Sequence, residues 1–467
     1  MQITYFAALL GYIILLLGVS FLFSRRMKNL EDFFLASRRL PGFLVYLSLT
    51  ASWIGATSTL VSVDEAYANG LSSFWIMGFP AVATVLIFAF FLTSRIRRLP
   101  IFSLPDLVEM RYGKTVRHMA SVLIVWYMVV LASSQMVAAG QFLGQFVGIN
   151  YLNGLLLGVG VVLIYSVFGG FFSVVVTDGF QFFCIAAGLA GLLIFLVGSY
   201  SFSDVCFLAQ NHGKVGYFNL FHDFERSFLV FISFTMAWII SPIAWQRIQS
   251  AQDEKKAKNG LFASSVTFFL FYGAVVLIGI LSLALFSSAN QEGPILSVII
   301  ASNSGYLLGG ILFIAVTASL MSTMDTAINT GALSLTRDVY QQIFQRKKSN
   351  HVVLISRIAT LVIGGLAFLI ATRLQSILTT LGLASEIMCV GFFIPGIAML
   401  YFPKKKPFAG GLSLSFGALY SFIGFLSSIE FIHLKWLEWP YSVPAGLGIS
   451  GAGFLVGLVI DRLNESF

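Results

Sequence analysis

Long apolar stretches separated by short polar segments alternate along almost the whole chain. Thirteen such stretches cover residues 3–24, 44–66, 72–94, 116–146, 153–170, 172–198, 227–246, 259–286, 305–333, 351–373, 378–402, 408–428 and 440–461. Most of them reach the ~20 residues that a helix needs to cross the hydrocarbon core of a bilayer. The pattern predicts an all-α, polytopic protein with thirteen transmembrane helices in the cell (inner or plasma) membrane.

Two of these stretches are not expected to form continuous, lipid-facing helices. The stretch "LTASWIGATSTLVSVDE" at 49–65 is rich in hydroxyl groups, and the seventh stretch contains Ser241-Pro242, where proline removes a backbone donor. Interrupted helices in corresponding positions, here five spans apart, are typical of inverted-repeat transporters that bind at the membrane midplane. The alternative is an ordinary proline kink together with a packing face of small residues.

Composition and charge exclude several classes of protein. The chain is 58% hydrophobic and 10% charged, whereas about a quarter of a soluble domain is charged. The net charge of +8 does not indicate nucleic-acid binding, because 24 of the 28 Lys and Arg residues fall in segments on one side of the predicted spans and 4 on the other. The positive-inside rule then predicts an outside N-terminus and an inside C-terminus. The first stretch lacks the flanks of a signal peptide and is interpreted as a retained span.

The ninth stretch carries a stripe of oxygen-bearing side chains. They are Ser319, Ser322, Thr323 and Thr326 at helical spacing, extended by Asp325 and Asn329. A carboxylate inside a membrane helix usually marks an ion path or an ion pair, and oxygen ligands suit a hard cation. The alternative is that the hydroxyls bond the carbonyls one turn back in their own helix.

A second acid, Asp178, lies in the sixth stretch beside Thr177 and Gln181, with no basic residue near it in the sequence. It is either a hydrogen-bonded or protonated structural residue, or a cation ligand or proton carrier that faces the ninth span. Together, Asp178 and Asp325 can hold one positive charge or share a proton, because two close carboxylates resist joint ionisation.

These motifs resemble those of the sodium:solute symporters, relatives of bacterial proline, pantothenate, sialic acid and sugar symporters. The resemblance covers nearly the whole chain and rests on "ASWIGATST" at 51–59, "SLPDLVEMRYG" at 103–113, "GGFFSVVVTDGFQ" at 169–181, "WQRIQSAQDEKKA" at 245–257 and "ASLMSTMDTAIN" at 318–329. It implies one transmembrane domain, 1–467, of the LeuT type. Two inverted five-helix repeats would occupy 40–199 and 225–402, with one helix before them at 3–24 and two after them at 408–461.

The resemblance also implies a sodium site between the second and ninth spans. Its ligands would be the carbonyls of Ala51, Ile54 and Ser319 and the hydroxyls of Ser322 and Thr323. Some members bind a second sodium deeper, where this chain offers Ser322, Asp178, Asp325 and Thr326. Asp325 stands where the clearest two-sodium members carry Ser. One sodium, two sodium ions, or a sodium and a proton therefore all stay open.

The expected solute-facing residues come from four spans. They are Trp53, Thr57, Ser58, Ser134, Gln135, Trp238, Ser241 and Glu386, and each of them can equally serve in helix packing. Trp53 resembles a position of the high-affinity choline transporters, where aromatic rings attract an ammonium group. Ser241, however, stands where those proteins carry a second Trp and where sugar members tend to carry Asn or Asp. An amino acid, a carboxylate, a sugar or a quaternary amine remain as solutes.

The sequence thus predicts a sodium-coupled secondary active transporter that imports a small polar organic solute by alternating access. Its partners would be the solute, sodium and the lipid bilayer, and not nucleic acid. An enzyme is not expected, because no Ser/His/Asp set, HExxH motif or metal cluster occurs. The alternatives are a proton-coupled symporter of the same fold and a non-transporting membrane sensor. The sensor is disfavoured because no signalling domain follows Phe467.

Overall fold

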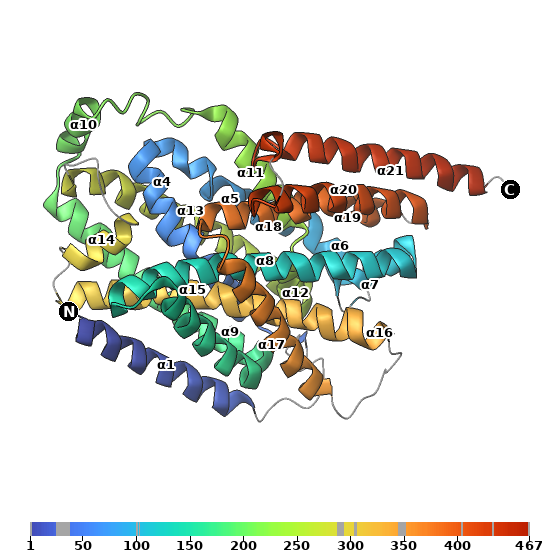
Figure 1. Ribbon diagram of the computed structural model, residues 1–467, viewed down its shortest axis with the longest axis horizontal. Coiled ribbons are helices and arrows are strands. Elements are labelled where there is room, and N and C mark those ends of the chain that lie inside the picture. Colours follow the sequence, from blue (N-terminus) through green and yellow to red (C-terminus); the bar gives the residue numbers. More distant parts are fainter. Residues whose placement is uncertain are drawn as a thin grey trace.

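The computed structural model describes residues 2–24, 38–99, 101, 103–286, 294–302, 306–343, 352–402, 405–431 and 434–465. The regular structure in these ranges is helical, and they contain one isolated β-bridge, between Leu40 and Ala251. Figure 1 shows the helices running roughly parallel to the long axis of the molecule.

The first half of the chain forms α1 (Gln2–Ser24), α3 (Gly42–Trp53), η2 (Thr57–Val61), α4 (Ser62–Asn69), η3 (Gly70–Trp75), α5 (Gly78–Ile87), η4 (Phe88–Leu92), α6 (Thr93–Arg98), α7 (Leu104–Tyr112), α8 (Lys114–Val147), α9 (Tyr151–Ser199) and α10 (Phe202–Asn211). The second half forms α11 (Phe224–Ile239), α12 (Pro242–Ser250), α13 (Glu254–Leu285), α14 (Ile295–Ser302), α15 (Tyr306–Leu333), η5 (Ser334–Tyr340), α16 (Gln341–Ile343), α17 (Val352–Ala371), α18 (Ile377–Gly391), α19 (Phe393–Tyr401), α20 (Pro407–Ser428), η6 (Lys435–Leu437) and α21 (Val443–Glu465).

Eight helices among the described residues are long and apolar enough to cross a membrane, or up to ten if each bent pair counts as one span. Three shorter apolar helices, at Tyr5–Val19, Gly42–Trp53 and Tyr151–Val167, add to them. The polytopic, all-helical class is confirmed, while the number thirteen stays a prediction. The stretches predicted as separate spans at 153–170 and 172–198 fall within the single helical element α9, because no proline or polar segment separates them.

Both predicted breaks are present. The helix α3 ends at Trp53, and the following residue, Ile54, has a ψ of 81° that no α-helix contains. The axes of α11 and α12 differ by 42°, with Ser241 as the N-cap and Pro242 as the first residue of α12. Proline suits that first position because its missing amide hydrogen would have no helical acceptor there.

A third break was not predicted. The axes of α18 and α19 differ by 43° at Phe392, inside the apolar stretch 378–402. Pro395 in the first turn of α19 is the sequence signal for it, since proline is tolerated at the start of a helix but not in its interior.

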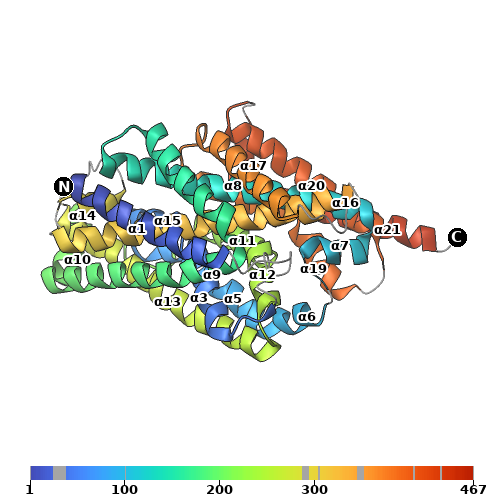
Figure 2. The same cartoon turned by 90° about the horizontal axis from the view of Figure 1, so that it is seen from below.

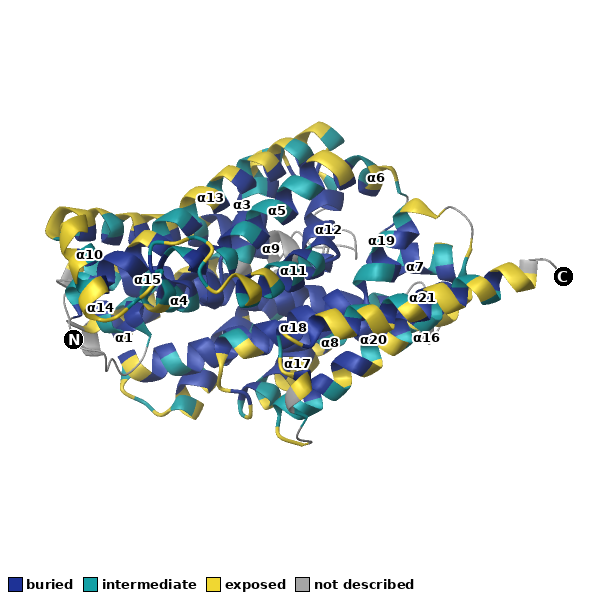
Figure 3. Ribbon diagram, turned by 90° about the horizontal axis from the view of Figure 1, so that it is seen from above, coloured by how far each residue is buried: buried dark blue, intermediate teal, exposed yellow. Residues whose placement is uncertain are grey.

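The long helices α8 and α15 form the centre of the bundle and pack against each other and against α9. Figure 3 shows buried residues on these central helices and exposed residues along the outer faces of α13, α20 and α21. The helix α1 packs on α9, as Figure 2 shows from another side, and the pair α20–α21 packs on α18. An apolar exposed face of this kind is what contact with lipid requires.

The two ends of the bundle differ in charge. The start of α1 lies at one end with α10 and α14, and the end of α21 lies beyond α6, α7 and α16 at the other (Figure 1). The basic residues of α6 and α7, Arg95, Arg97, Arg98 and Arg111, belong to the second end. The predicted inside residues Arg25, Arg26, Lys28, Arg346, Lys347, Lys348 and Lys404 lie outside the described residues.

The short helix predicted at 103–113 is α7, and it begins and ends as its sequence indicates. Asp106 accepts a hydrogen bond from the amide of Ser103 at 3.0 Å, and Gly113 ends the helix with a φ of 91° that favours glycine. The helix is fixed to its neighbours by ion pairs of Asp106 with Arg117 at 3.0 Å and with Arg337 at 2.9 Å.

Candidate functional site

Gln135 of α8 holds the break after α3 in place. The amide of Ala56, which in a continuous helix would donate to a carbonyl four residues back, donates to Gln135 Oε1 at 2.8 Å. A Cβ atom on Gly55 would lie 2.6 Å from Gln135 Oε1 and 2.7 Å from Thr323 Oγ1. Glycine at position 55 therefore allows the chain to pass between α8 and α15. Ile54, one of the predicted sodium ligands, is the C-cap residue directly after Trp53, the last residue of α3.

Hydroxyl groups of α15 meet the carbonyls beside this break. Ser322 Oγ lies 3.1 Å from the carbonyl oxygen of Ala51 and 3.1 Å from that of Ser319. Thr323 Oγ1 donates to the carbonyl oxygen of Ser52 at 3.1 Å. The predicted ligands Ala51, Ser319, Ser322 and Thr323 thus converge on one place where α3 meets α15. A shell of carbonyl and hydroxyl oxygens is chemically suited to a hard cation.

A cavity of about 40 Å³ adjoins the break. Its walls are formed by Ser52, Trp53, Gly55, Thr57, Ser58, Met77, Tyr127, Leu131, Gln135, Trp238, Ser241, Ile243, Thr323 and Leu381, none of which carries a formal charge. Six of the eight predicted solute-facing residues are among them, namely Trp53, Thr57, Ser58, Gln135, Trp238 and Ser241. The cavity therefore shares its wall with the cluster of oxygen atoms between α3 and α15.

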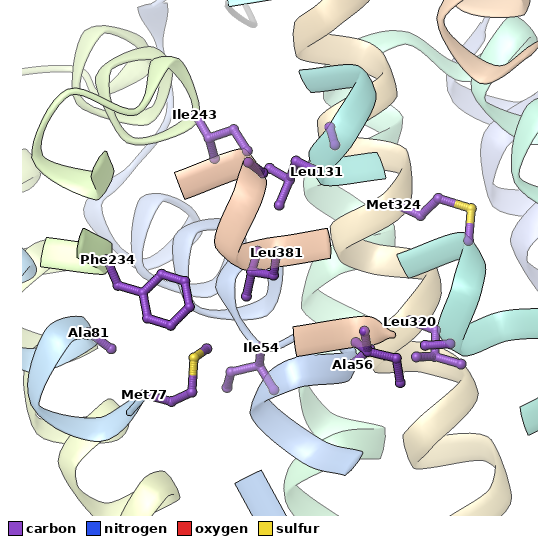
Figure 4. Packing of buried hydrophobic residues seen from close by; sticks show 14 of the residues in the cluster. Ile54, Ala56, Met77, Ala81, Leu131, Phe234, Ile243, Leu320, Met324 and Leu381 are labelled. Carbon is purple, nitrogen blue, oxygen red and sulfur yellow. The ribbon is translucent and has the colours of Figure 1, made fainter. Parts of the chain in front are cut away.

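Aromatic rings form one side of the cavity. The ring centroids of Trp53 and Trp238 are 5.3 Å apart, and Trp53 stacks on Phe268 with centroids 5.9 Å apart. Behind Trp238, Phe234 stacks at 5.2 Å. Figure 4 shows Phe234 and Met77 pointing toward the region of Ile54 and Leu381, so this side of the cavity is backed by apolar side chains. Such a wall suits the apolar part of a solute or the face of a cationic group.

Two hydroxyls on the η2 side differ in their availability. Ser58 Oγ donates to the carbonyl oxygen of Trp53 at 3.0 Å and lies 2.7 Å from the hydroxyl of Tyr272. Thr57 Oγ1 is buried and has no hydrogen-bond partner among the described residues. A buried hydroxyl without a partner is costly unless something else bonds it. Thr57 is therefore the hydroxyl in this wall with capacity left for a ligand.

Two predicted solute-facing residues do not line the cavity. Ser134 Oγ donates to the carbonyl oxygen of Leu131 at 2.8 Å within α8, and accepts from Gln135 Nε2 at 3.1 Å, so it supports Gln135 instead. Glu386 is buried against the C-terminal helices, where Ser442 Oγ donates to its Oε1 at 2.7 Å. Both residues lie apart from this cavity, and their contact with a solute stays a prediction. The sequence gives no direction here, because every face of the middle of α8 and of α18 around Glu386 is buried.

Asp178 lies next to a buried arginine that its sequence neighbourhood does not reveal. Its Oδ2 accepts from Ser48 at 2.8 Å and from Ser52 at 3.1 Å, and Arg247 Nη2 lies 3.7 Å away. Arg247, from α12, is 1% exposed and also donates to Ser52 Oγ at 2.8 Å and to Thr326 Oγ1 at 3.1 Å. Asp178 is thus a member of an ion pair, a reading that the sequence alone did not offer.

Asp325 completes this group of buried charges. Its Oδ2 accepts a hydrogen bond from the hydroxyl of Tyr165 at 2.7 Å, and its Oδ1 is buried with no hydrogen-bond partner among the described residues. Thr326 Oγ1 lies 3.1 Å from Ser52 Oγ, which links this group to α3. If both acids are ionised, Arg247 leaves one negative charge in excess, which one further monovalent cation or one proton would neutralise.

The cavity lies between two hollows at successive levels of the same helices. One, of about 610 Å³, is lined by residues that include Val61, Glu65, Gln141 and Leu378. Arg226 also lines it and forms an ion pair with Glu65 at 3.1 Å. The other, of about 20 Å³, includes Pro242, Trp245 and Gln246 on one side and Thr330, Leu333 and Ser334 on the other. The larger hollow lies at the end where α4 and α11 meet, and the smaller lies beside α7 and α12.

The relationship of this chain to known proteins agrees with its architecture. Residues 33–406 match the family model described as the sodium:solute symporter family. The chain is 24% identical to the "Sodium/pantothenate symporter" of Escherichia coli over 98% of this chain and 96% of that protein. It is 24% identical to "High-affinity choline transporter 1" of Drosophila melanogaster and 28% identical to the human "Sodium/iodide cotransporter". It spans 65% and 64% of those two proteins, respectively.

Solved structures of similar fold are also transporters. A Na⁺-coupled sialic acid symporter in a substrate-bound outward-open state superposes with a TM-score of 0.80 at 19% identity, over 98% of this chain and 97% of that one. MhsT in complex with L-phenylalanine gives a TM-score of 0.54 at 13% identity, over 89% of this chain and 98% of that one. The LeuT-type fold is therefore confirmed.

Proposed function

We propose that this chain, which belongs to the sodium:solute symporter family, is a sodium-coupled secondary active transporter that imports a small polar solute by alternating access. The observation that carries the proposal is the contact of α15 with the break after α3. Ser322 Oγ is within 3.1 Å of the carbonyl oxygens of Ala51 and Ser319, and Thr323 Oγ1 is within 3.1 Å of that of Ser52. Carbonyls freed by a broken helix that lines a cavity are ready ligands for sodium.

Sodium would act as the link between two walls of the transport path. With the ligands Ala51, Ile54, Ser319, Ser322 and Thr323, the ion bridges α3 and α15 and favours the arrangement in which these helices meet. Without the ion, the carbonyl and hydroxyl oxygens of these residues, which carry partial negative charges, lie close together, and only the hydrogens of the hydroxyl groups lie between them. Inward movement of one sodium ion contributes about 2.3 kcal/mol per 100 mV of membrane potential, which drives solute accumulation.

The two broken helices fit the proposed inverted repeats at 40–199 and 225–402, flanked by the helices of 3–24 and 408–461. The breaks at Gly55 and Ser241 both border the central cavity, as expected when corresponding helices of two repeats form one midplane site. The basic ends of α6 and α7 support an inside position for that end of the bundle, hence an outside N-terminus, an inside C-terminus and a place in the cell membrane.

The solute would bind in the uncharged cavity with its apolar part against Trp53 and Trp238. Thr57 Oγ1, which has no partner among the described residues, would bond a polar group of the solute. Ser58, Gln135 and Ser241 complete the polar side of the cavity. The absence of a charged side chain from the described cavity wall favours a solute that is neutral or zwitterionic, or a cation held by aromatic faces.

A second ion would be held at Asp178, Asp325 and Thr326. The single excess negative charge beside Arg247 leaves room for one more monovalent cation, a sodium ion or a proton. We favour a proton on Asp325, because Arg247 donates to Thr326 Oγ1 and so places its positive charge where a second sodium would need that oxygen. A symporter driven by protons alone is the competing function.

Uptake by proteoliposomes tests the proposal. The panel would contain radiolabelled choline, proline, glucose, pantothenate, sialic acid and iodide, the substrates named in the relatives' descriptions. An imposed inward sodium gradient is expected to drive accumulation of one of them, with a proton gradient at equal potential as the control. Accumulation that follows the proton gradient and ignores sodium would instead establish the competing function.

A further inference from the structure

Trp439 lies in the segment between α20 and α21 and is wedged between two helices that wall the cavity. Its indole Nε1 donates to Ser233 Oγ of α11 at 3.0 Å. Its ring packs on Gly382 of α18 so closely that a Cβ atom there would lie 2.5 Å from the ring. Gly382 directly follows Leu381, which lines the cavity. One side chain from outside the two proposed repeats thus contacts both walls.

A chain of contacting aromatic rings connects Trp439 to the cavity itself. The ring centroids of Trp439 and Phe234 are 5.4 Å apart, those of Phe234 and Trp238 are 5.2 Å apart, and those of Trp238 and Trp53 are 5.3 Å apart. Because Trp238 and Trp53 line the cavity, a displacement of Trp439 would remove support from the ring that backs the cavity wall.

The segment that carries Trp439 is itself fixed to α18. Ser442 Oγ donates to Glu386 Oε1 at 2.7 Å, and Tyr420 of α20 donates from its hydroxyl to the carbonyl oxygen of Ser442 at 3.0 Å. Glu386 lies four residues after Gly382 and therefore on the same face of α18. That face holds the segment at two successive turns, which gives buried Glu386 a positioning role that the proposed transport site does not use.

The barrier between the cavity and the larger hollow is thin at this place. On α18, Leu381 lines the cavity and Leu378, one turn earlier, lines the hollow. On η2, Thr57 lines the cavity and Val61, one turn later, lines the hollow. The barrier is therefore about one helical turn of side chains thick. To open the cavity toward the hollow, α18 has to move away from the broken helices. Trp439 is bonded to α11 and packed on α18, so it opposes that movement.

We propose that residues 434–442 form an outer strap that holds the cavity closed toward the larger hollow, with Trp439 as the wedge between α11 and α18. The proposal rests on the proposed function, since it assigns the strap to the outer closure of a transport path. The helices α20 and α21 then regulate outward opening although they lie outside both proposed repeats.

The strap can be tested without a known solute by measuring how fast an external thiol reagent reaches a cysteine introduced into the cavity wall. The reporter is Leu131→Cys on α8, in a background where Cys184, Cys206 and Cys389 are replaced by Ala. Intact cells expressing the protein are treated with a membrane-impermeant methanethiosulfonate reagent, and the rate of modification is measured. Trp439→Ala is expected to raise this rate tenfold or more. Trp439→Phe, which loses the bond to Ser233, is expected to raise it about fivefold, the population shift that loss of one hydrogen bond produces.

Phe431→Ala is the matched control, because Phe431 lies in the same connection between α20 and α21, before the strap, and is 75% exposed. Its rate is expected to equal that of the reporter alone. Equal rates in Trp439→Ala, Trp439→Phe and the reporter would overturn the strap. If Trp439→Ala fails to fold, Trp439→Phe and Ser233→Ala decide alone, and unchanged rates in both overturn the proposal. A strap effect together with modification rates and uptake that ignore sodium would support the strap and contradict the proposed function.

Discussion

Ser322 Oγ lies 3.1 Å from the carbonyl oxygen of Ala51 and joins two helices whose contacting residues are 271 positions apart in the chain. The contact exists because α3 ends at Trp53: the carbonyl of Ala51 accepts from the backbone amide of Ile54 at 3.3 Å and still has room to accept from the hydroxyl of Ser322 on α15. The same serine also reaches the carbonyl of Ser319. A sodium ion that binds the hydroxyl oxygen and both carbonyl oxygens can replace the hydrogen bonds between them. This relationship is the basis of the proposed coupling.

Thr323→Ala is expected to raise the sodium concentration needed for half-maximal thermal stabilisation about tenfold, the effect of ~1.4 kcal/mol from one lost ligand. Thr323→Ser keeps the hydroxyl and is expected to stay near the unmodified protein. The matched control is Thr317→Ala, whose hydroxyl bonds the carbonyl of Phe313 within α15. An equal shift in the Thr317 and Thr323 variants would mean that loss of helix packing, and not of a ligand, explains the result.

Gly55→Ala is expected to abolish sodium-dependent stabilisation and uptake. Its Cβ atom would collide with Gln135 Oε1 at 2.6 Å and Thr323 Oγ1 at 2.7 Å, so the break and α15 would be forced apart. Gly273→Ala on α13 meets no atom within 4 Å and serves as the control. Purified protein of both variants would be titrated with sodium chloride while the melting temperature is followed. A Gly55 variant with an ordinary sodium titration would contradict the assigned geometry.

Arg247→Met is expected to destabilise the folded protein by about 3–5 kcal/mol, because it leaves the buried Asp178 without its ion-pair partner. The double variant Arg247→Met, Asp178→Asn removes both charges and is expected to recover most of this loss. Thermal unfolding in detergent of the two single variants and the double variant measures the coupling. Additive losses would show that the 3.7 Å contact between the two side chains carries no coupling energy.

Trp238→Ala is expected to weaken solute binding at least tenfold while leaving sodium binding without solute nearly unchanged. Trp238 lines the cavity with its ring 5.3 Å from that of Trp53, but no sodium ligand proposed here belongs to α11. Trp75→Ala is a suitable control, since Trp75 does not line the cavity. Its indole Nε1 donates to the carbonyl oxygen of Leu220 at 3.0 Å. The measurement is the apparent KM of uptake at saturating sodium, and an unchanged KM would remove Trp238 from the solute site.

Asp325→Asn is expected to make uptake less dependent on internal and external pH without changing the slope of its sodium dependence. The reason is that a neutral amide imitates the protonated acid beside Tyr165, whose hydroxyl lies 2.7 Å from Asp325 Oδ2. Hill coefficients for sodium and pH profiles of uptake would be compared with those of the unmodified protein. A fall of the Hill coefficient from about 2 to about 1 would indicate a second sodium ion there instead.

The sequence was sufficient to predict the helical membrane class and both breaks that form the site. Glycine and hydroxyl residues at 51–59 and Ser241-Pro242 act locally, so their effect on a helix can be derived without knowing the neighbours. The stripe on the ninth span could be derived for the same reason, since Ser319, Ser322 and Thr323 share one helix face whatever packs on it, and their role as sodium ligands stays a proposal.

The remaining features depend on how distant helices meet. Arg247 directly follows the seventh predicted stretch, 227–246, which predicts a position at the membrane boundary, but the tilt of α12 after Pro242 carries it to Asp178. Glu386 was expected to face the solute, but α18 is buried on all sides and its sequence gives no direction. Tyr165 bonds Asp325, and Tyr272 bonds Ser58. Neither tyrosine was predicted as a site residue, because a single tyrosine in an apolar span usually serves packing.

Direct binding of sodium-22 to the purified protein, with potassium chloride to hold ionic strength constant, tests the central claim most directly. The unmodified protein is expected to bind sodium saturably, and the double variant Ser322→Ala, Thr323→Ala is expected to lose that binding while its folding, judged by circular dichroism, is retained. A binding curve for the folded double variant that coincides with that of the unmodified protein would contradict a sodium site between α3 and α15.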